Sequence, residues 1–200
     1  MSNTGLFTPE DINELTAYGQ WQGLSQRGTL ELIQTQSYSF GVSAVDFTSI
    51  KESEYNVHFM TFSNMQSDTD NKEVMQIQLY ESGVLETGSV YNYARQNCSD
   101  GGGFNESKST SDDDWPLMGG SGDQTNERQY GYLYLYDLGN SAKYSYCTWM
   151  SGMWSSDPYF YNSFGSGVLP QASIVDGIRV KTNGGNFASF DISLYGIRYS

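Results

Sequence analysis

The stretch Val175–Ser200, VDGIRVKTNGGNFASFDISLYGIRYS, places two apolar-polar alternating segments around the turn Thr182–Gly185. Alternation with period two is typical of a β-strand that buries one face, and Asn-Gly pairs favour tight turns. We therefore predict a terminal hairpin in which Ile192 and Leu194 point inward. A last strand paired within a sheet fixes the end of the chain. For that reason we expect this strand to be necessary for folding.

The same alternation recurs through most of the chain. It is seen in TLELIQTQSYSF (29–40), VSAVDFTSI (42–50), YNVHFMTFSNM (55–65), EVMQIQLYES (73–82), GSVYNYARQ (88–96), QYGYLYLYDLGN (129–140) and AKYSYCTWMSGMW (142–154). The Gly-Asn turn between the last two predicts a hairpin. Abundant Tyr (16) and Gly (22), with only 16% charged residues, also favour strands and turns. We predict an all-β fold over residues 28–200: a two-sheet antiparallel sandwich, specifically a jelly roll.

Residues 1–27 carry a different signal. Thr8 is a suitable helix cap, Pro9 suits the first helical position, and acidic residues follow at the positive end of the helix dipole. We predict a short helix within an N-terminal docking arm. Its candidate docking residues are Leu6, Phe7, Ile12, Leu15, Tyr18 and Trp21.

Two further segments are candidate binding regions. Residues 99–127 form a Gly/Ser/Asp-rich stretch that we predict to be a long loop anchored by Trp115 and Leu117, and long loops in compact domains are usually functional or partly disordered. Residues 149–165, WMSGMWSSDPYFYNSFG, concentrate aromatic side chains in a Ser/Gly-rich frame, a composition that suits subunit interfaces or stacking on sugars. The candidate glycan or protein contacts are Trp115, Trp149, Trp154, Tyr159 and Tyr161. A second aromatic row is formed by Tyr132, Tyr134 and Tyr136. The alternative is that one of the two rows belongs to the core and the other to a polar-tipped outer face.

Catalytic patterns are sparse. His58 is the only histidine, and without a GxSxG or Cys-His signature it reads as a packed or surface imidazole rather than as part of a triad or zinc site. A glycan hydrolase would need two carboxylates ~5 to ~10 Å apart across a cleft. The acids in or beside predicted strands are Glu31, Asp46, Glu73, Glu81, Asp137 and Asp191. We expect no enzyme, no catalytic residue, no cofactor and no metal site.

The acidic segments 68–70 and 112–114 leave one alternative open. Asp68 and Asp70, or Asp112–Asp114, could offer oxygen ligands to Ca²⁺, but neither has the spacing of an EF-hand loop. Solvated acidic loops are the simpler interpretation.

The net charge of −13 disfavours binding to nucleic acid. No apolar run approaches the ~20 residues that span a bilayer, and the first residues lack a secretory signal. We expect no membrane partner and folding in a cytoplasm, where Cys98 and Cys147 would be free thiols.

Three segments carry a resemblance to known proteins: GTLELIQTQ (28–36), GYLYLYDLGNSAKY (131–144) and the closing motifs GIRV, GGNFAS and ISLYGIR (177–198). Together they resemble a family of virion proteins of tailed marine bacteriophages. The likeness covers residues 28–198. It implies a jelly-roll-like sandwich and a place in the virion, and its motifs carry no catalytic residue.

The absence of a stalk repeat before residue 28 favours a capsid decoration or head-associated protein, or a small tail appendage, over a long fibre. The implied partners are other virion proteins, and by analogy a homo-oligomer such as a trimer. One alternative is a carbohydrate-binding module of a tail fibre that reads host-surface glycans. A jelly-roll glycan hydrolase is the other.

Overall fold

The computed structural model describes residues 8, 10, 30–39, 41–70, 75–120, 122–155 and 157–197. The elements of these ranges are thirteen β-strands. The prediction of an all-β fold over residues 28–200 is therefore confirmed for the described part of that range. The predicted helix and all six docking residues (Leu6, Phe7, Ile12, Leu15, Tyr18 and Trp21) lie outside the described residues.

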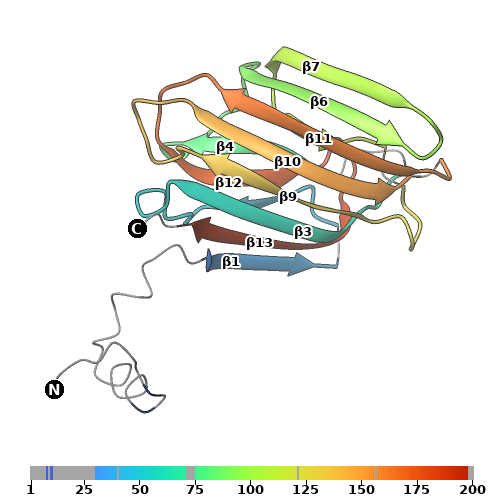
Figure 1. Ribbon diagram of the computed structural model, residues 1–200, viewed down its shortest axis with the longest axis horizontal. Helices are drawn as coiled ribbons and strands as arrows, with labels where there is room; N and C mark the ends of the chain where they lie inside the picture. The colour runs from blue at the N-terminus through green and yellow to red at the C-terminus, as the bar shows by residue number, and fades with distance from the viewer. Residues whose placement is uncertain are drawn as a thin grey trace.

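The strands form two antiparallel sheets, as a sandwich requires (Figure 1). The eight-stranded sheet has the order β1 (Leu30–Tyr38), β13 (Phe187–Ile197), β3 (Val57–Ser67), β9 (Gln129–Tyr136), β10 (Ser145–Trp154), β11 (Phe160–Leu169), β6 (Tyr91–Ser99) and β7 (Phe104–Asp112). The five-stranded sheet has the order β2 (Ala44–Phe47), β12 (Val175–Lys181), β4 (Met75–Glu81) and β5 (Val84–Leu85), and β8 (Trp115–Met118) also pairs with β4.

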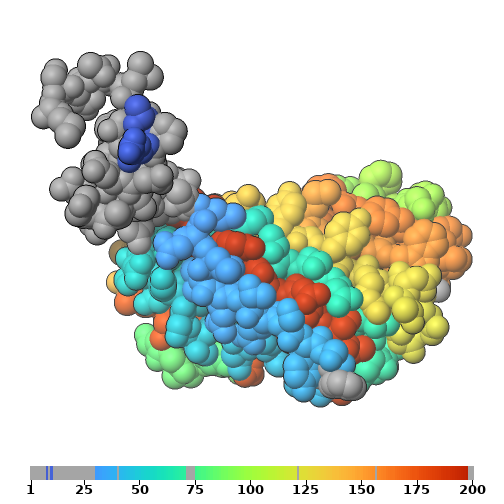
Figure 2. Space-filling view, turned by 90° about the horizontal axis from the view of Figure 1, so that it is seen from below, coloured from blue at the N-terminus to red at the C-terminus, as the bar shows by residue number. Residues whose placement is uncertain are grey.

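The prediction of a terminal hairpin is wrong, because β12 and β13 belong to different sheets. β12 pairs with β2 and β4, whereas β13 lies between β1 and β3 (Figure 2). The connection bends sharply at Gly184 and Gly185, where φ is +81° and +75°, a region that favours glycine. Asp68 holds the bend from β3, since its carboxylate accepts hydrogen bonds from the backbone and side-chain amides of Asn186 at 2.8 and 2.9 Å. The turn thus carries the chain from one sheet to the other.

The core lies between the inner faces of the two sheets. Ile192 and Leu194 are fully buried there, as their alternation predicts. β9 and β10 form the expected hairpin, with Leu135 opposite Cys147 and Leu133 opposite Trp149. These side chains belong to one cluster of buried residues that also includes side chains of β4 and β12, and burial of the cluster's apolar area stabilises the sandwich.

The predicted loop over residues 99–127 is also wrong, because it contains β7 and β8. β7 is an edge strand, and its sequence FNESKSTSD has no apolar alternation since most of it is exposed. β8, WPLM, is buried throughout and too short to show a period. Trp115 and Leu117 are anchors, as predicted, with neither side chain exposed.

The pairing of β13 on both sides, with β1 and β3, and the burial of its inward side chains make those side chains sensitive to truncation. Leu194→Ala should lower the free energy of unfolding by about 2–5 kcal/mol, because it leaves a cavity between the sheets. Leu32→Ala on the neighbouring strand is the matched control, since that leucine is 55% exposed, and should change stability by less than about 1 kcal/mol. Urea denaturation measures both, and equal effects would contradict the assigned faces.

Candidate functional site

The outer face of the eight-stranded sheet carries most of the exposed aromatic side chains. Strand registers place its residues in rows that cross the sheet. One row crosses all eight strands in the order Leu32, Tyr195, Phe59, Tyr134, Thr148, Ser166, Ala94 and Lys108. The row is apolar and aromatic at the β1 end, small in the middle, and charged at the β7 end.

Aromatic packing fills the half of this face that lies over β13, β3 and β9. The ring of Phe59 contacts Tyr134, Tyr132 and Tyr195, with centroids 4.7, 6.0 and 6.1 Å apart. Tyr134 also stacks on Tyr136 at 6.3 Å. The three tyrosines of β9 thus form an outer row of polar-tipped rings, one of the two arrangements that the sequence left open.

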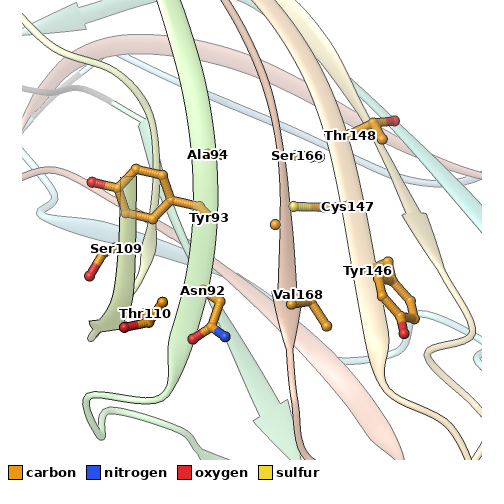
Figure 3. A pocket seen from close by; sticks show the side chains of 11 residues that line it. Asn92, Tyr93, Ala94, Ser109, Thr110, Tyr146, Cys147, Thr148, Ser166 and Val168 are labelled. Carbon is orange, nitrogen blue, oxygen red and sulfur yellow. The ribbon is translucent and has the colours of Figure 1, made fainter. Parts of the chain in front are cut away.

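A groove occupies the other half, over β10, β11, β6 and β7. Two adjoining hollows of about 440 and 580 Å³ share Ala94 and Ser166, which face each other across β6 and β11. Figure 3 shows the first hollow, with side chains from all four strands: Tyr146 and Thr148, Ser166 and Val168, Asn92 and Ala94, and Thr110. Gln96 and Phe164 line the second. The floor is low because the central row carries only Thr148, Ser166 and Ala94 where it crosses β10, β11 and β6.

Two tryptophans that the sequence suggested as surface contacts lie beneath this groove instead. Trp149 is 3% exposed and donates its indole N–H to the Leu117 carbonyl at 3.1 Å. Trp115 is fully buried and donates to the Asn92 carbonyl at 3.2 Å. Both are core residues, so this part of the prediction is wrong: each indole satisfies its one donor with a backbone carbonyl and buries its ring.

The other predicted contacts lie near one end of the sheet, outside the groove. Trp154 and Tyr159 are 41% and 44% exposed, and the ring of Tyr159 lies against Gly101. Tyr161 is half-buried on β11, opposite Met153. The sequence therefore identified exposed aromatic residues here but missed the groove. The signal that could have found it is the alternation in NSFGSGV (162–168), where glycines alternate with Ser and Phe.

The groove is close to electrically neutral. Its outward-facing charged side chains are Glu106 and Lys108 of β7, which pair with each other at 3.0 Å. Arg95 also borders the second hollow, but its guanidinium lies on the inner side of β6, where it donates to the Pro116 carbonyl at 2.7 Å. The exposed pair contributes little stability. The pair does, however, leave the groove without net charge of its own, although the whole chain carries −13.

The strand-borne acids do not converge on the groove. Asp46 forms a two-point ion pair with Arg179 at 2.7 and 2.9 Å, and this contact holds the pKa of Asp46 below its usual range. Further contacts are Glu31 with Lys51, Asp137 with Lys143, Asp191 with Asn64 and Glu81 with Ser173. Glu73 lies outside the described residues. Glu106 is thus the one carboxylate that lines the groove in the described ranges.

His58 is fully buried. Its Nε2–H donates to the Ile50 carbonyl at 2.7 Å, and burial lowers the pKa of the imidazole. The packed interpretation is confirmed. Cys98 and Cys147 are free, as predicted, because Cys98 faces outward on β6 and Cys147 faces the core on β10.

Two acidic groups bring their oxygens within 4.8 Å of one another: Asp112–Asp114, and Asp70 with Asp123 and Glu127. Asp114 is 2% exposed and bonded to the Lys181 ammonium at 2.7 Å. Burial raises the pKa of Asp114 to about 6, and Lys181 opposes that shift. Asp68, by contrast, is engaged in the Asn186 turn. The ion pair with Lys181 already neutralises the most buried of these carboxylates.

Comparisons with protein-family models, curated proteins and solved structures gave no match. Within the described part of the chain, no helix is long and apolar enough to cross a membrane.

Trp149 and Trp154 lie on the same strand, but the same substitution should lower stability much more at Trp149 than at Trp154. Trp149→Phe removes a buried donor from the Leu117 carbonyl and leaves a void, so the free energy of unfolding should fall by about 1–3 kcal/mol. Trp154→Phe, on an exposed residue, should change it by less than about 0.5 kcal/mol. Thermal and urea unfolding of the two variants provides the measurement. A larger loss for Trp154→Phe would contradict the placement of the core.

Asp114 should make the free energy of unfolding fall as pH rises, the reverse of the usual effect of a carboxylate whose pKa is lowered by folding. Its folded pKa of about 6 exceeds its ordinary value of 3.8, so the folded state binds this proton more tightly than the unfolded state. The contribution is therefore fully present below about pH 4 and is lost as pH rises through about 6. Relative to Asp114→Asn, the wild type should lose about 2–3 kcal/mol between pH 4 and pH 7.

Urea titrations at several pH values measure this difference. Asp113→Asn, at an exposed neighbouring carboxylate, is the control and should leave most of the pH dependence in place. A constant difference between wild type and Asp114→Asn across this range would refute the assignment.

Proposed function

We propose that this chain is a non-enzymatic structural protein of a bacteriophage virion: a capsid decoration or head-associated protein, or a small tail appendage. The observation that carries the proposal is the order of its strands, which agrees with the fold implied by the sequence resemblance. Eight strands, taken in chain order, are β1, β2, β3, β4, β8, β9, β12 and β13. Their pairing gives two four-stranded sets, β1-β13-β3-β9 and β2-β12-β4-β8.

This order supports a jelly roll, a fold in which consecutive strands pass repeatedly between two sheets. The remaining strands are insertions: β5–β7 precede β8, and β10 and β11 follow β9. Four of these five strands extend one sheet of the jelly roll on the side away from β1. Viral capsid and lectin domains commonly use jelly rolls. The fold alone supports a class of roles and not a position in the particle.

The proposal that the protein is non-enzymatic is supported by the arrangement of its acids. The hydrolase alternative needs two facing carboxylates. Glu106 lines the groove beside Lys108, and the described strand-borne acids are engaged elsewhere in ion pairs or hydrogen bonds.

The virion proposal is tested with the intact protein and an arm-deleted variant. Antibodies against the chain should label purified phage particles, and full-length protein added during assembly should sediment with them. Deletion of residues 1–27 should leave a folded sandwich, with an unchanged circular dichroism spectrum, that no longer sediments with particles. Unlabelled particles would overturn the virion role, whereas full incorporation of the deletion variant would overturn only the docking role of the arm.

A second candidate function is glycan adhesion, as a carbohydrate-binding module of the same particle. The specific observation that favours it is the near-neutral groove over β10, β11, β6 and β7, which combines aromatic rings with hydroxyl and amide groups. Trp149 cannot stack on a sugar at this surface, since its ring is buried. A contact surface built from Tyr146 and Phe164 replaces it.

A further inference from the structure

We infer that the groove between Tyr146 and Phe164 binds a short stretch of an uncharged glycan. The inference rests on the second candidate function and is independent of where the protein sits in a particle.

The first argument is the spacing of the two rings. Tyr146 lies in one cross-strand row, beside Val168, and Phe164 lies in another, beside Met150. Four residues along the strands separate these rows, a length of about 13 Å. Both side chains are more than 40% exposed. Two exposed rings at the ends of a low floor offer stacking surfaces to a chain of sugar rings laid along the strands.

The second argument is the polar character of the floor and walls. In the described part of the chain, the side chains of Asn92, Thr110 and Ser166 have no hydrogen-bond partner, although they line the groove. They provide hydroxyl and amide groups that both donate and accept, as sugar hydroxyls do. The Thr148 hydroxyl is held by Tyr136 at 3.2 Å, which fixes it at the edge of the floor.

The third argument is charge, which selects among possible occupants. Glu106 and Lys108 neutralise each other within the groove, while the whole chain carries −13. A polyanion such as a sulfated or uronate-rich polymer would be repelled by the chain and would meet one already paired lysine. A basic peptide would find one paired carboxylate. An uncharged polymer suffers neither penalty, so it fits best.

The test uses the full chain and three variants. Ser166→Arg fills the floor from an exposed position, Tyr146→Ala removes one ring, and Tyr130→Ala is the matched control, a 51%-exposed tyrosine of the same face outside the groove. The probes are neutral glucans, galactans and mannans embedded in native gels, with alginate and a sulfated galactan as charged counterparts. Thermal unfolding and light scattering check the fold and mass of each variant.

We expect at least one neutral polymer to retard the wild type and Tyr130→Ala equally. Ser166→Arg should abolish the retardation, and Tyr146→Ala should weaken binding roughly tenfold. The inference is overturned if none of the neutral polymers retards the wild type, if only charged polymers do, or if Ser166→Arg binds as well as the wild type. It is also overturned if Ser166→Arg lowers the oligomeric mass, because the face would then be an interface between copies. Particle association of Ser166→Arg reports separately on the virion role.

Discussion

The close approach of two indole rings to β11 constrains both the core and the surface of this protein. A Cβ on Gly167 would lie 2.6 Å from Trp115 Nε1, and a Cβ on Gly165 would lie 2.5 Å from the ring of Trp149. Neither glycine has a positive φ, so their role is to leave space and not to bend the chain. The sheets can pack around both tryptophans only because the two residues of β11 that face the indole rings have no side chain beyond a hydrogen atom.

The outer side of the same strand follows from this choice of small residues. Ser166 lies between the two glycines and faces Ala94 on β6 and Thr148 on β10. Bulky residues on these strands lie two positions away in each direction, at Tyr146 and Phe164. The floor of the groove is therefore the outer face of β11, and the inner face of the same strand packs against the two tryptophan rings. These buried rings lie directly beneath the floor.

Sequence patterns predicted which residues face inward much better than which strands pair. Leu133 and Leu135 are buried, and Tyr132, Tyr134 and Tyr136, which alternate with them, face outward, as period two requires. The same period does not indicate which sheet a strand joins. It therefore predicts one hairpin from β12 and β13, although the turn at Gly184 carries the chain from one sheet to the other. β7 was missed because an exposed edge strand need not alternate. Trp149 is buried and not a surface contact. Composition shows that an aromatic ring is present, but not whether a backbone carbonyl is available inside the fold to accept its N–H.

The chain divides into an eight-strand arrangement, β1-β13-β3-β9 packed with β2-β12-β4-β8, and five strands inserted into it, and this division separates the buried core from the surface of the groove. Ile192, Leu194 and their partners lie in strands of that arrangement, where burial dominates the energetics. The groove lies entirely over inserted strands, and its exposed residues Ser166, Phe164 and Tyr146 contribute little to the core. Substitutions of these residues can therefore reshape the groove without removing much buried apolar area. The exception is β11 itself, where a change at Gly165 or Gly167 would displace an indole and reshape the groove from beneath.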